Sequence, residues 1–166
     1  RGGDALAAIL YTGGTTGAPK GVMLSHANLW SAVLARLVEM ANPGYTALLT
    51  TPLFHVAGLA RVVSQTVLGA ASVIEPQFHP DAVIASIERH GVNDVVFVPS
   101  MLQMVLDHPA FDAGRLRSLK RIAHGAAPMP QPLLLRAMRM LPWVEFVAAY
   151  GMTENSAGVS TNGPFT

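Results

Sequence analysis

Apolar residues along the chain follow two alternating patterns. Short apolar runs of strand length occupy residues 5–11, 46–51, 71–74, 94–98, 119–123 and 144–150, with a shorter extended piece at 21–24. Between them, apolar residues recur at helical spacing over residues 25–40, 56–68, 80–90, 100–107 and 128–141. Ser25 is a typical N-cap, and Gly69 and Gly91 are typical helix ends. This alternation predicts an α/β fold, with a mostly parallel sheet, βαβ crossovers and helices on both faces.

The least ordinary segments of the chain directly follow these apolar runs. They are GGTTGAPKG, PLFHVAG, PSM, HGAAPMP and GMTEN. In open α/β sheets, ligands bind at the carboxyl ends of the strands. The pattern therefore predicts that these segments meet at one site.

Composition and charge narrow the classes of protein to consider. The 166 residues suffice for one α/β domain, and a net charge of +1 gives no reason to expect nucleic acid or an anionic membrane as partner. The absence of cysteine excludes thiolate catalysis and fits a cytoplasmic location, with peripheral membrane attachment of a longer parent as the alternative. No apolar stretch is long enough to predict a transmembrane segment.

The proportion of charged residues is unusually low. It is 13%, against roughly 25% in typical soluble domains, while 51% of the residues are hydrophobic. Either the chain is apolar throughout, or it is a segment of a larger protein whose other parts cover its faces. We favour the second interpretation and expect a single α/β segment over residues 1–166, truncated at both ends.

The loop YTGGTTGAPKG, residues 11–21, has the chemistry of a phosphate-binding loop. Glycines let backbone N–H groups face a ligand, threonines add hydroxyl groups, and Lys20 adds a positive charge. It is not a Walker A loop, because Ala18 and Pro19 separate Gly17 from Lys20. It is not a dinucleotide-binding fingerprint either, because no acidic residue follows at the required distance.

This loop resembles the signature loop of the AMP-forming adenylating enzymes. That superfamily contains acyl-CoA synthetases, the adenylation domains of peptide synthetases and firefly-type luciferases. The segments PLFHVAG, VPSM, HGAAPMP and YGMTE follow in the family's order, so the resemblance covers nearly the whole chain. The usual loop has serine where this chain has Gly13, and glycine there resembles the variant common among fatty-acyl-CoA synthetases.

The resemblance implies which residues contact ATP. Thr15, Thr16 and Lys20 would contact the β- and γ-phosphates, and Thr153 would contact the α-phosphate. Residues 125–128 and Tyr150 would lie on the two faces of adenine. The full nucleotide-binding set implied is Thr12, Gly13, Gly14, Thr15, Thr16, Gly17, Lys20, Gly125, Ala126, Ala127, Pro128, Tyr150, Gly151, Met152 and Thr153.

The resemblance also implies the chemistry and the groups that perform it. A carboxylate, on this reading from a fatty acid, attacks the α-phosphorus of Mg²⁺·ATP, and coenzyme A then displaces AMP. The residues implied as catalytic are Lys20, His55, Thr153 and Glu154, with Glu154 and Thr16 at the Mg²⁺ ion. The acid is expected to lie against His55, Val56, Gly58, Leu59, Ser100 and Met101, with Val62 and Met104 nearby, a lining without charge.

Two alternatives stay open beside an acyl-CoA synthetase. The parent could load a carrier protein, as acyl-AMP ligases and adenylation domains do, or the chain could be a non-catalytic nucleotide-binding or interaction module. The low charge would then mark a protein interface. The sequence does not determine the acid or the oligomeric state.

The resemblance implies that the ribose-binding aspartate and the C-terminal lid would lie beyond residue 166. We therefore predict that the 166-residue chain alone carries half of an ATP site and forms no acyl-CoA. The measurement is acyl-CoA formation by the purified chain with ATP, Mg²⁺, coenzyme A and a panel of acids. Robust product formation would contradict the prediction.

Overall fold

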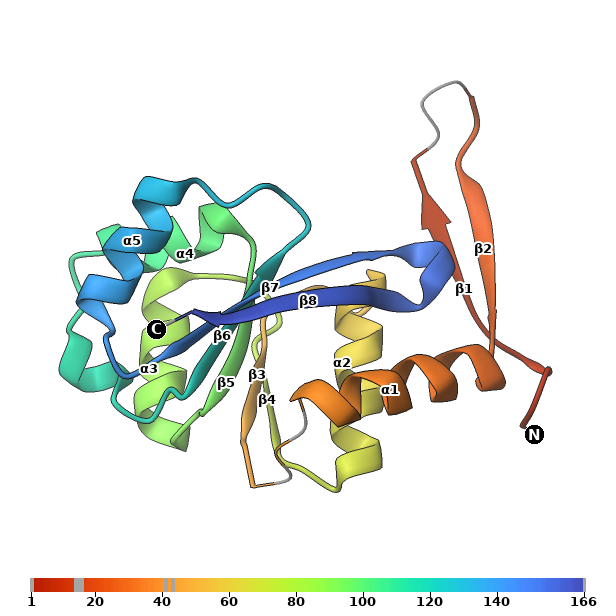
Figure 1. Ribbon diagram of the computed structural model, residues 1–166, viewed down its shortest axis with the longest axis horizontal. Helices are drawn as coiled ribbons and strands as arrows, with labels where there is room; N and C mark the ends of the chain where they lie inside the picture. The colour runs from red at the N-terminus through yellow and green to blue at the C-terminus, as the bar shows by residue number, and fades with distance from the viewer. Residues whose placement is uncertain (1, 14–16, 41, 43, 166) are drawn as a thin grey trace.

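The computed structural model describes residues 2–13, 17–40, 42 and 44–165. At the N-terminal end, two antiparallel strands form a hairpin, β1 (Leu6–Thr12) and β2 (Lys20–Ser25). The hairpin projects away from the rest of the molecule (Figure 1). The sequence placed residues 5–11 among the strands of the parallel sheet, and this was wrong, because β1 pairs only with β2 in the described part of the chain. Its apolar side chains pack against α1 and α2 instead.

The remaining described strands form one sheet, in the order β4-β3-β5-β6-β7-β8. The first five in that order pair in parallel, which confirms the predicted α/β class. Their bounds are Ala47–Leu49 for β3, Ser72–Ile74 for β4, Asp94–Phe97 for β5, Arg121–Gly125 for β6, Glu145–Met152 for β7 and Ala157–Phe165 for β8.

Strand β8 pairs antiparallel with β7 at the edge of this sheet and was missed in the sequence. Its residues AGVSTNGPF are mostly small or polar, a composition typical of loops. Its pairing with β7 makes it a strand, because this pairing satisfies backbone hydrogen-bonding groups of both segments.

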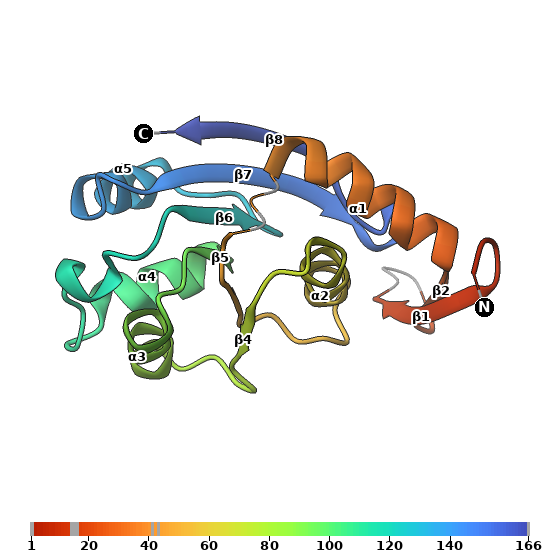
Figure 2. The ribbon, with the colours of Figure 1, turned by 90° about the horizontal axis from the view of Figure 1, so that it is seen from below.

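Five helices among the described residues cover the sheet. They are α1 (His26–Met40), α2 (Val56–Leu68), α3 (Pro80–His90), α4 (Pro99–Asp107) and α5 (Gln131–Met140). The last begins three residues later than predicted, because residues 128–130 form the loop after β6. Figure 2 shows α1 and α2 together on one side, and α3, α4 and α5 grouped on the other.

The predicted helix ends are confirmed. The Asn28 N–H donates to Ser25 Oγ at 3.1 Å, so Ser25 caps the start of α1. Gly69 and Gly91 follow α2 and α3 in the left-handed conformation, at φ values of 62° and 59°. No helix within the described ranges combines the length and the apolar content needed to cross a bilayer.

The main core lies between β5, β6 and β7 and the helices α3, α4 and α5. Phe97 and Phe146 are its largest fully buried side chains, and Ile84, Leu102 and Ile122 pack with them. A smaller cluster joins the hairpin to α1, α2 and β8 through Leu24, Leu29, Val56 and other apolar residues. The opposite face of β5 and β6 is therefore free of this main core and faces α1 and α2.

We predict that Phe146→Ala lowers the free energy of unfolding by about 3–5 kcal/mol, because it removes a side chain that is 0% exposed from the main core. Urea-induced unfolding followed by circular dichroism measures the change. Leu135→Ala on the exposed side of α5 is the matched control and should stay within about 0.5 kcal/mol of the original chain. Equal effects of the two substitutions would contradict this account of the core.

Candidate nucleotide and acid site

A cavity of about 390 Å³ lies on the face of the sheet opposite the main core, a volume within the range of small-molecule sites. Its wall comes from alternate residues of the strands. Val96, Ala123 and Gly125 line it, while Val95 and Ile122 point into the main core. The small side chains on β6 and β7 leave the space that larger residues would fill. Residues from α1, α2 and β8 close the other sides.

One end of the cavity lies at the carboxyl ends of β6 and β7. Gly125, Ala126, Tyr150 and Gly151 line it there. A Cβ atom at position 125 would lie 2.3 Å from the carbonyl oxygen of Ala149, so only glycine fits between these strands. Ala126 follows in the left-handed region, with φ of 63°, which turns the chain sharply away from the sheet. A flat ligand can therefore approach the backbone closely at this end.

His55 stands at the same end, at the start of α2. Its Nδ1 accepts a hydrogen bond of 3.2 Å from the Ala57 N–H, which caps the helix. This bond fixes the orientation of the ring and leaves Nε2 as its available donor. His55 is exposed and lines the cavity beside Phe54 and Val56.

The predicted acid-pocket residues divide between two places. His55, Val56 and Met101 line the cavity, whereas Gly58, Leu59 and Ser100 are not among its lining residues. Ser100 lies in the first turn of α4, and with Met104 it lines a separate shallow hollow beside Asp107. The helical period explains this division, because residues next to one another in a helix point in different directions.

The predicted phosphate-binding loop connects the two strands of the hairpin. Thr12 and Lys20 are paired in register at its base, and the Thr12 hydroxyl donates to the Lys20 carbonyl at 3.5 Å. Gly13 and Gly17 are exposed. Gly14, Thr15 and Thr16, which the sequence also assigned to ATP, lie outside the described residues.

The segment with Thr153 and Glu154 lies next to this hairpin. Both residues belong to a short 3-10 helix, η2 (Thr153–Asn155), directly after β7, and η2 contacts β2. Glu154 is exposed, and Met152 lies at the end of β7. Ala127 and Pro128 follow Ala126 in the exposed loop after β6. The structure therefore brings the hairpin and the ends of β6 and β7 to one region, although they are far apart in the sequence.

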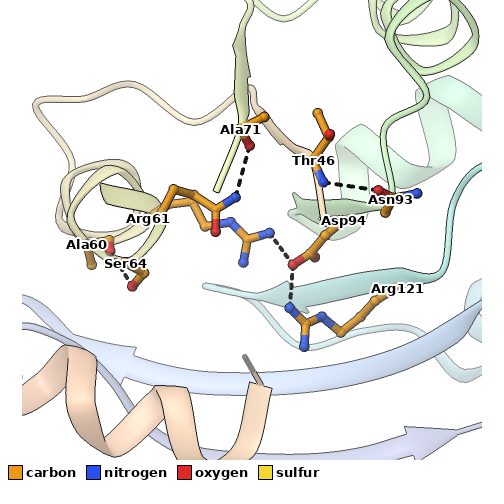
Figure 3. A network of polar contacts seen from close by, with 9 residues as sticks. Thr46, Ala60, Arg61, Ser64, Ala71, Asn93, Asp94 and Arg121 are labelled. Atoms are coloured by element: carbon orange, nitrogen blue, oxygen red, sulfur yellow. Dashed lines mark hydrogen bonds and ion pairs between the residues drawn. The ribbon is translucent and has the colours of Figure 1, made fainter. Parts of the chain in front are cut away.

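The opposite end of the cavity contains charged residues that the sequence analysis missed. Asp94 begins β5 and Arg121 begins β6, and both face the cavity with Arg61 of α2 (Figure 3). Arg61 Nη2 lies 2.5 Å from Asp94 Oδ2, and Arg121 Nη2 donates to the same oxygen. Arg36 of α1 also lines the cavity. The cavity is therefore charged at this end, unlike the uncharged set of residues expected to contact the acid.

Local sequence patterns do not reveal this cluster. Charged residues at the start of a strand or on one side of a helix are usually exposed, so these arginines were not singled out. Their burial results from tertiary packing, since the Asp94 side chain is only 4% exposed. Burial, and secondarily the neighbouring Arg61, lowers the pKa of the Arg36 guanidinium.

His124 is buried on the face of β6 that points away from the cavity. It is 5% exposed, and within the described residues its Nε2 has no hydrogen-bond partner. Burial lowers the pKa of its imidazole, because the charged form would lose its hydration. The strand alternation thus directs Ala123 and Gly125 to the cavity and His124 away from it.

The chain belongs to the AMP-binding enzyme family, whose model matches residues 1–166. Among its relatives, a feruloyl-CoA synthase from Amycolatopsis is 38% identical over 158 residues, covering 94% of this chain and 32% of that protein. An indoleacetate–CoA ligase from Aromatoleum aromaticum is 36% identical over 148 residues, covering 88% of this chain and 29% of that protein. The chain thus spans about a third of the length of these relatives.

A solved structure shows the same fold. The o-succinylbenzoate coenzyme A synthetase from Bacillus subtilis, in complex with ATP and magnesium ion, has a TM-score of 0.84 and 32% sequence identity. The match covers 97% of this chain and 33% of that one. The fold is therefore that of the N-terminal domain of adenylate-forming enzymes.

We predict that His124 makes the chain less stable as the pH falls. Because its pKa is lower in the folded state, the unfolded chain binds more protons below about pH 6.5, so the free energy of unfolding decreases by up to ~1.4 kcal/mol per pH unit. Urea unfolding at about pH 7.5 and pH 5.5 measures this loss.

The comparison that isolates His124 is the variant His124→Gln, which should lose less stability between these two pH values. Leu135→Ala, which changes an exposed side chain that does not titrate, provides the control and should keep the pH dependence of the original chain. An unchanged pH dependence in His124→Gln would show that His124 is not the source.

Proposed function

We propose that the full-length protein containing this chain is an ATP-dependent acid–CoA ligase that works through an acyl-adenylate. The observation that carries this proposal is the meeting of three segments at one edge of the sheet. The hairpin that contains Lys20 contacts η2, which contains Glu154 and directly follows β7, and residues at the ends of β6 and β7 line the cavity. A nucleotide held by these segments would place its α-phosphate beside the open end of an enclosed site for an acid.

The described residues at this edge suit a nucleotide. Gly125 and Ala126 offer a backbone surface without large side chains, and the Tyr150 ring is 63% exposed at the same edge. Adenine between them would gain contact on both faces. Lys20 and the glycine-rich loop would neutralise and hold the β- and γ-phosphates, and the Thr153 hydroxyl would contact the α-phosphate.

The donor set near Glu154 also fits Mg²⁺. No cluster of three or more metal-ligating side chains occurs in the parts of the chain that the structure describes. Mg²⁺ is usually held by one or two carboxylates together with substrate phosphates, so the single Glu154 carboxylate is sufficient, and the resemblance adds the hydroxyl of Thr16, which lies outside the described residues. The bound ion would supply charge neutralisation for the triphosphate.

The chemistry needs positioning more than a protein nucleophile. A carboxylate oxygen of the acid forms a bond to the α-phosphorus as the bond to pyrophosphate breaks. The thiol sulfur of coenzyme A then forms a bond to the acyl carbon, its proton is released, and AMP leaves. His55 Nε2, which is free to donate because Nδ1 accepts from Ala57, would donate to the acid carboxylate at the open end of the cavity. The chain contains no cysteine, and none is required.

Two observations bear on the acid. Gly13 favours a fatty acid by resemblance, whereas ferulate, indoleacetate and succinylbenzoate are the acids in the names of the relatives. We propose an acid with an apolar body, because Val56, Val98 and Met101 line the cavity.

We predict that Lys20→Ala and Glu154→Ala each lower kcat/KM for acid-dependent pyrophosphate release from ATP by about 10²–10³, because each removes a charge that would stabilise the transferring phosphate. Pyrophosphate release by the full-length protein across a panel of carboxylic acids is the measurement. Lys120→Ala and Glu145→Ala change exposed residues at the other end of the sheet and serve as matched controls.

Unchanged adenylation in both site variants would overturn the assignment of this site. Adding coenzyme A or a carrier protein as acceptor then separates two outcomes. Acyl transfer to coenzyme A supports the ligase, and transfer only to the carrier shows an adenylating enzyme of another type. Absence of pyrophosphate release with every acid would show a non-catalytic nucleotide-binding module.

A further inference from the structure

The closed end of the cavity carries an excess of positive charge. Among the described residues that line it, Arg36, Arg61 and Arg121 are cationic and Asp94 is the single anion. These residues come from α1, α2, β6 and β5, so separate parts of the fold direct their charged groups toward one space. Figure 3 shows Arg61 and Arg121 reaching Asp94 from opposite sides.

Asp94 cannot balance this charge. Both of its ion pairs use Oδ2, with Arg61 at 2.5 Å and Arg121 on the other side. One carboxylate therefore serves two guanidinium groups, and Arg36 adds a third. Burying charge is unfavourable unless a partner of opposite sign and enough hydrogen bonds compensate for the lost hydration. Among the described residues that line the cavity, three guanidinium groups therefore share a single carboxylate.

Individual nitrogen atoms show the same deficit. Nε and Nη2 of Arg36, and Nε of Arg61, are buried without a hydrogen-bond partner in the parts of the chain that the structure describes. The Arg61 side chain is only 14% exposed. Guanidinium donors in this situation would bind a planar acceptor, and a carboxylate matches their geometry.

The position of this cluster identifies which part of a ligand it would meet. Along β6, Gly125 marks the open end and Arg121 the closed end, and these positions are four residues apart, roughly 13 Å. The reacting carboxylate must stay at the open end, beside the segments proposed to hold the nucleotide. A group that reaches the arginines is therefore a second group at the far end of the acid.

We propose that the acid is a dicarboxylic acid, whose second carboxylate binds Arg36 and Arg61, with Arg121 beside them. This inference rests on the proposed function, because it assumes that the cavity holds the acid. The apolar lining between the two ends accommodates a hydrocarbon or aromatic body. Asp94 orients Arg61 and Arg121, so it acts as a positioning residue rather than as a ligand contact.

Matched pairs of acids test this proposal in the full-length protein. Each pair consists of an acid with a terminal carboxylate and the same acid with a methyl group there, such as para-carboxycinnamate and para-methylcinnamate, and aliphatic pairs of increasing length. We expect kcat/KM for pyrophosphate release to favour the dicarboxylic member of the best pair by at least about tenfold, mainly through KM.

Substitutions of the arginines provide the second arm. Arg36→Met and Arg61→Met should each lower kcat/KM for the dicarboxylic acid at least about tenfold and change that of its methyl partner less than about threefold. Arg36→Met breaks no described ion pair, so it keeps the test valid if Arg61→Met impairs folding. The exposed Arg139 on α5 is the matched control, and Arg139→Met should leave both values unchanged.

Calorimetric binding of each acid pair separates this proposal from the proposed function. Dicarboxylate binding that Arg36→Met weakens, without pyrophosphate release, would support the inference and overturn the ligase. Pyrophosphate release that favours the methyl acids at every length, or arginine variants that affect both members of a pair equally, would overturn the inference and leave the ligase intact. Equal effects of the arginine variants on both acids are also expected if an acidic side chain elsewhere in the full-length protein neutralises the arginines.

Discussion

The alternation of side chains along β5 and β6 determines where this molecule can bind a ligand. Val95, Phe97 and Ile122 face the helices α3, α4 and α5 and join the sheet to its main core. Their neighbours Asp94, Val96 and Ala123 face the other way and line the cavity. A shift of register by one residue would exchange these two sets, placing charge in the core and large apolar groups in the cavity. Packing on one face therefore maintains the space on the other.

Most of the parallel sheet and its helices could be predicted from local patterns. The apolar runs and helical spacing identified β3 to β7 and α1 to α5, because burial on a sheet requires those patterns. The hairpin and β8 could not be placed in this way. Leu10 of the hairpin is buried like a strand residue of the main sheet, but it belongs to the smaller core cluster. Strand β8 has the composition of a loop. Strand pairing, which is not local in sequence, decides both.

The residues of the candidate site also fall into two groups, those that local sequence predicts and those that only tertiary packing brings together. The segments at the open end were conspicuous because glycines, Lys20, His55 and Glu154 break the apolar pattern at strand ends. The residues of the closed end were not conspicuous in the sequence, because a buried arginine has the same local sequence pattern as an exposed one. Arg61 and Asp94 are distant in sequence, and only the packing of α2 against the sheet brings Arg61 Nη2 to 2.5 Å from Asp94 Oδ2. The chemistry of the open end follows from composition, and that of the closed end from tertiary structure.

The direct passage from β2 into α1 has a consequence for how the proposed nucleotide and acid sites affect each other's affinity. Lys20 begins β2 and Arg36 lies in α1, so one continuous segment extends from the proposed phosphate-binding loop to the arginine end of the cavity. Ser25 caps the junction through the Asn28 N–H, which leaves no loop to absorb independent movement of the two parts. A ligand that immobilises one part lowers the entropic cost of immobilising the other. Nucleotide and acid would then bind with positive cooperativity, and the linkage is reciprocal whichever binds first.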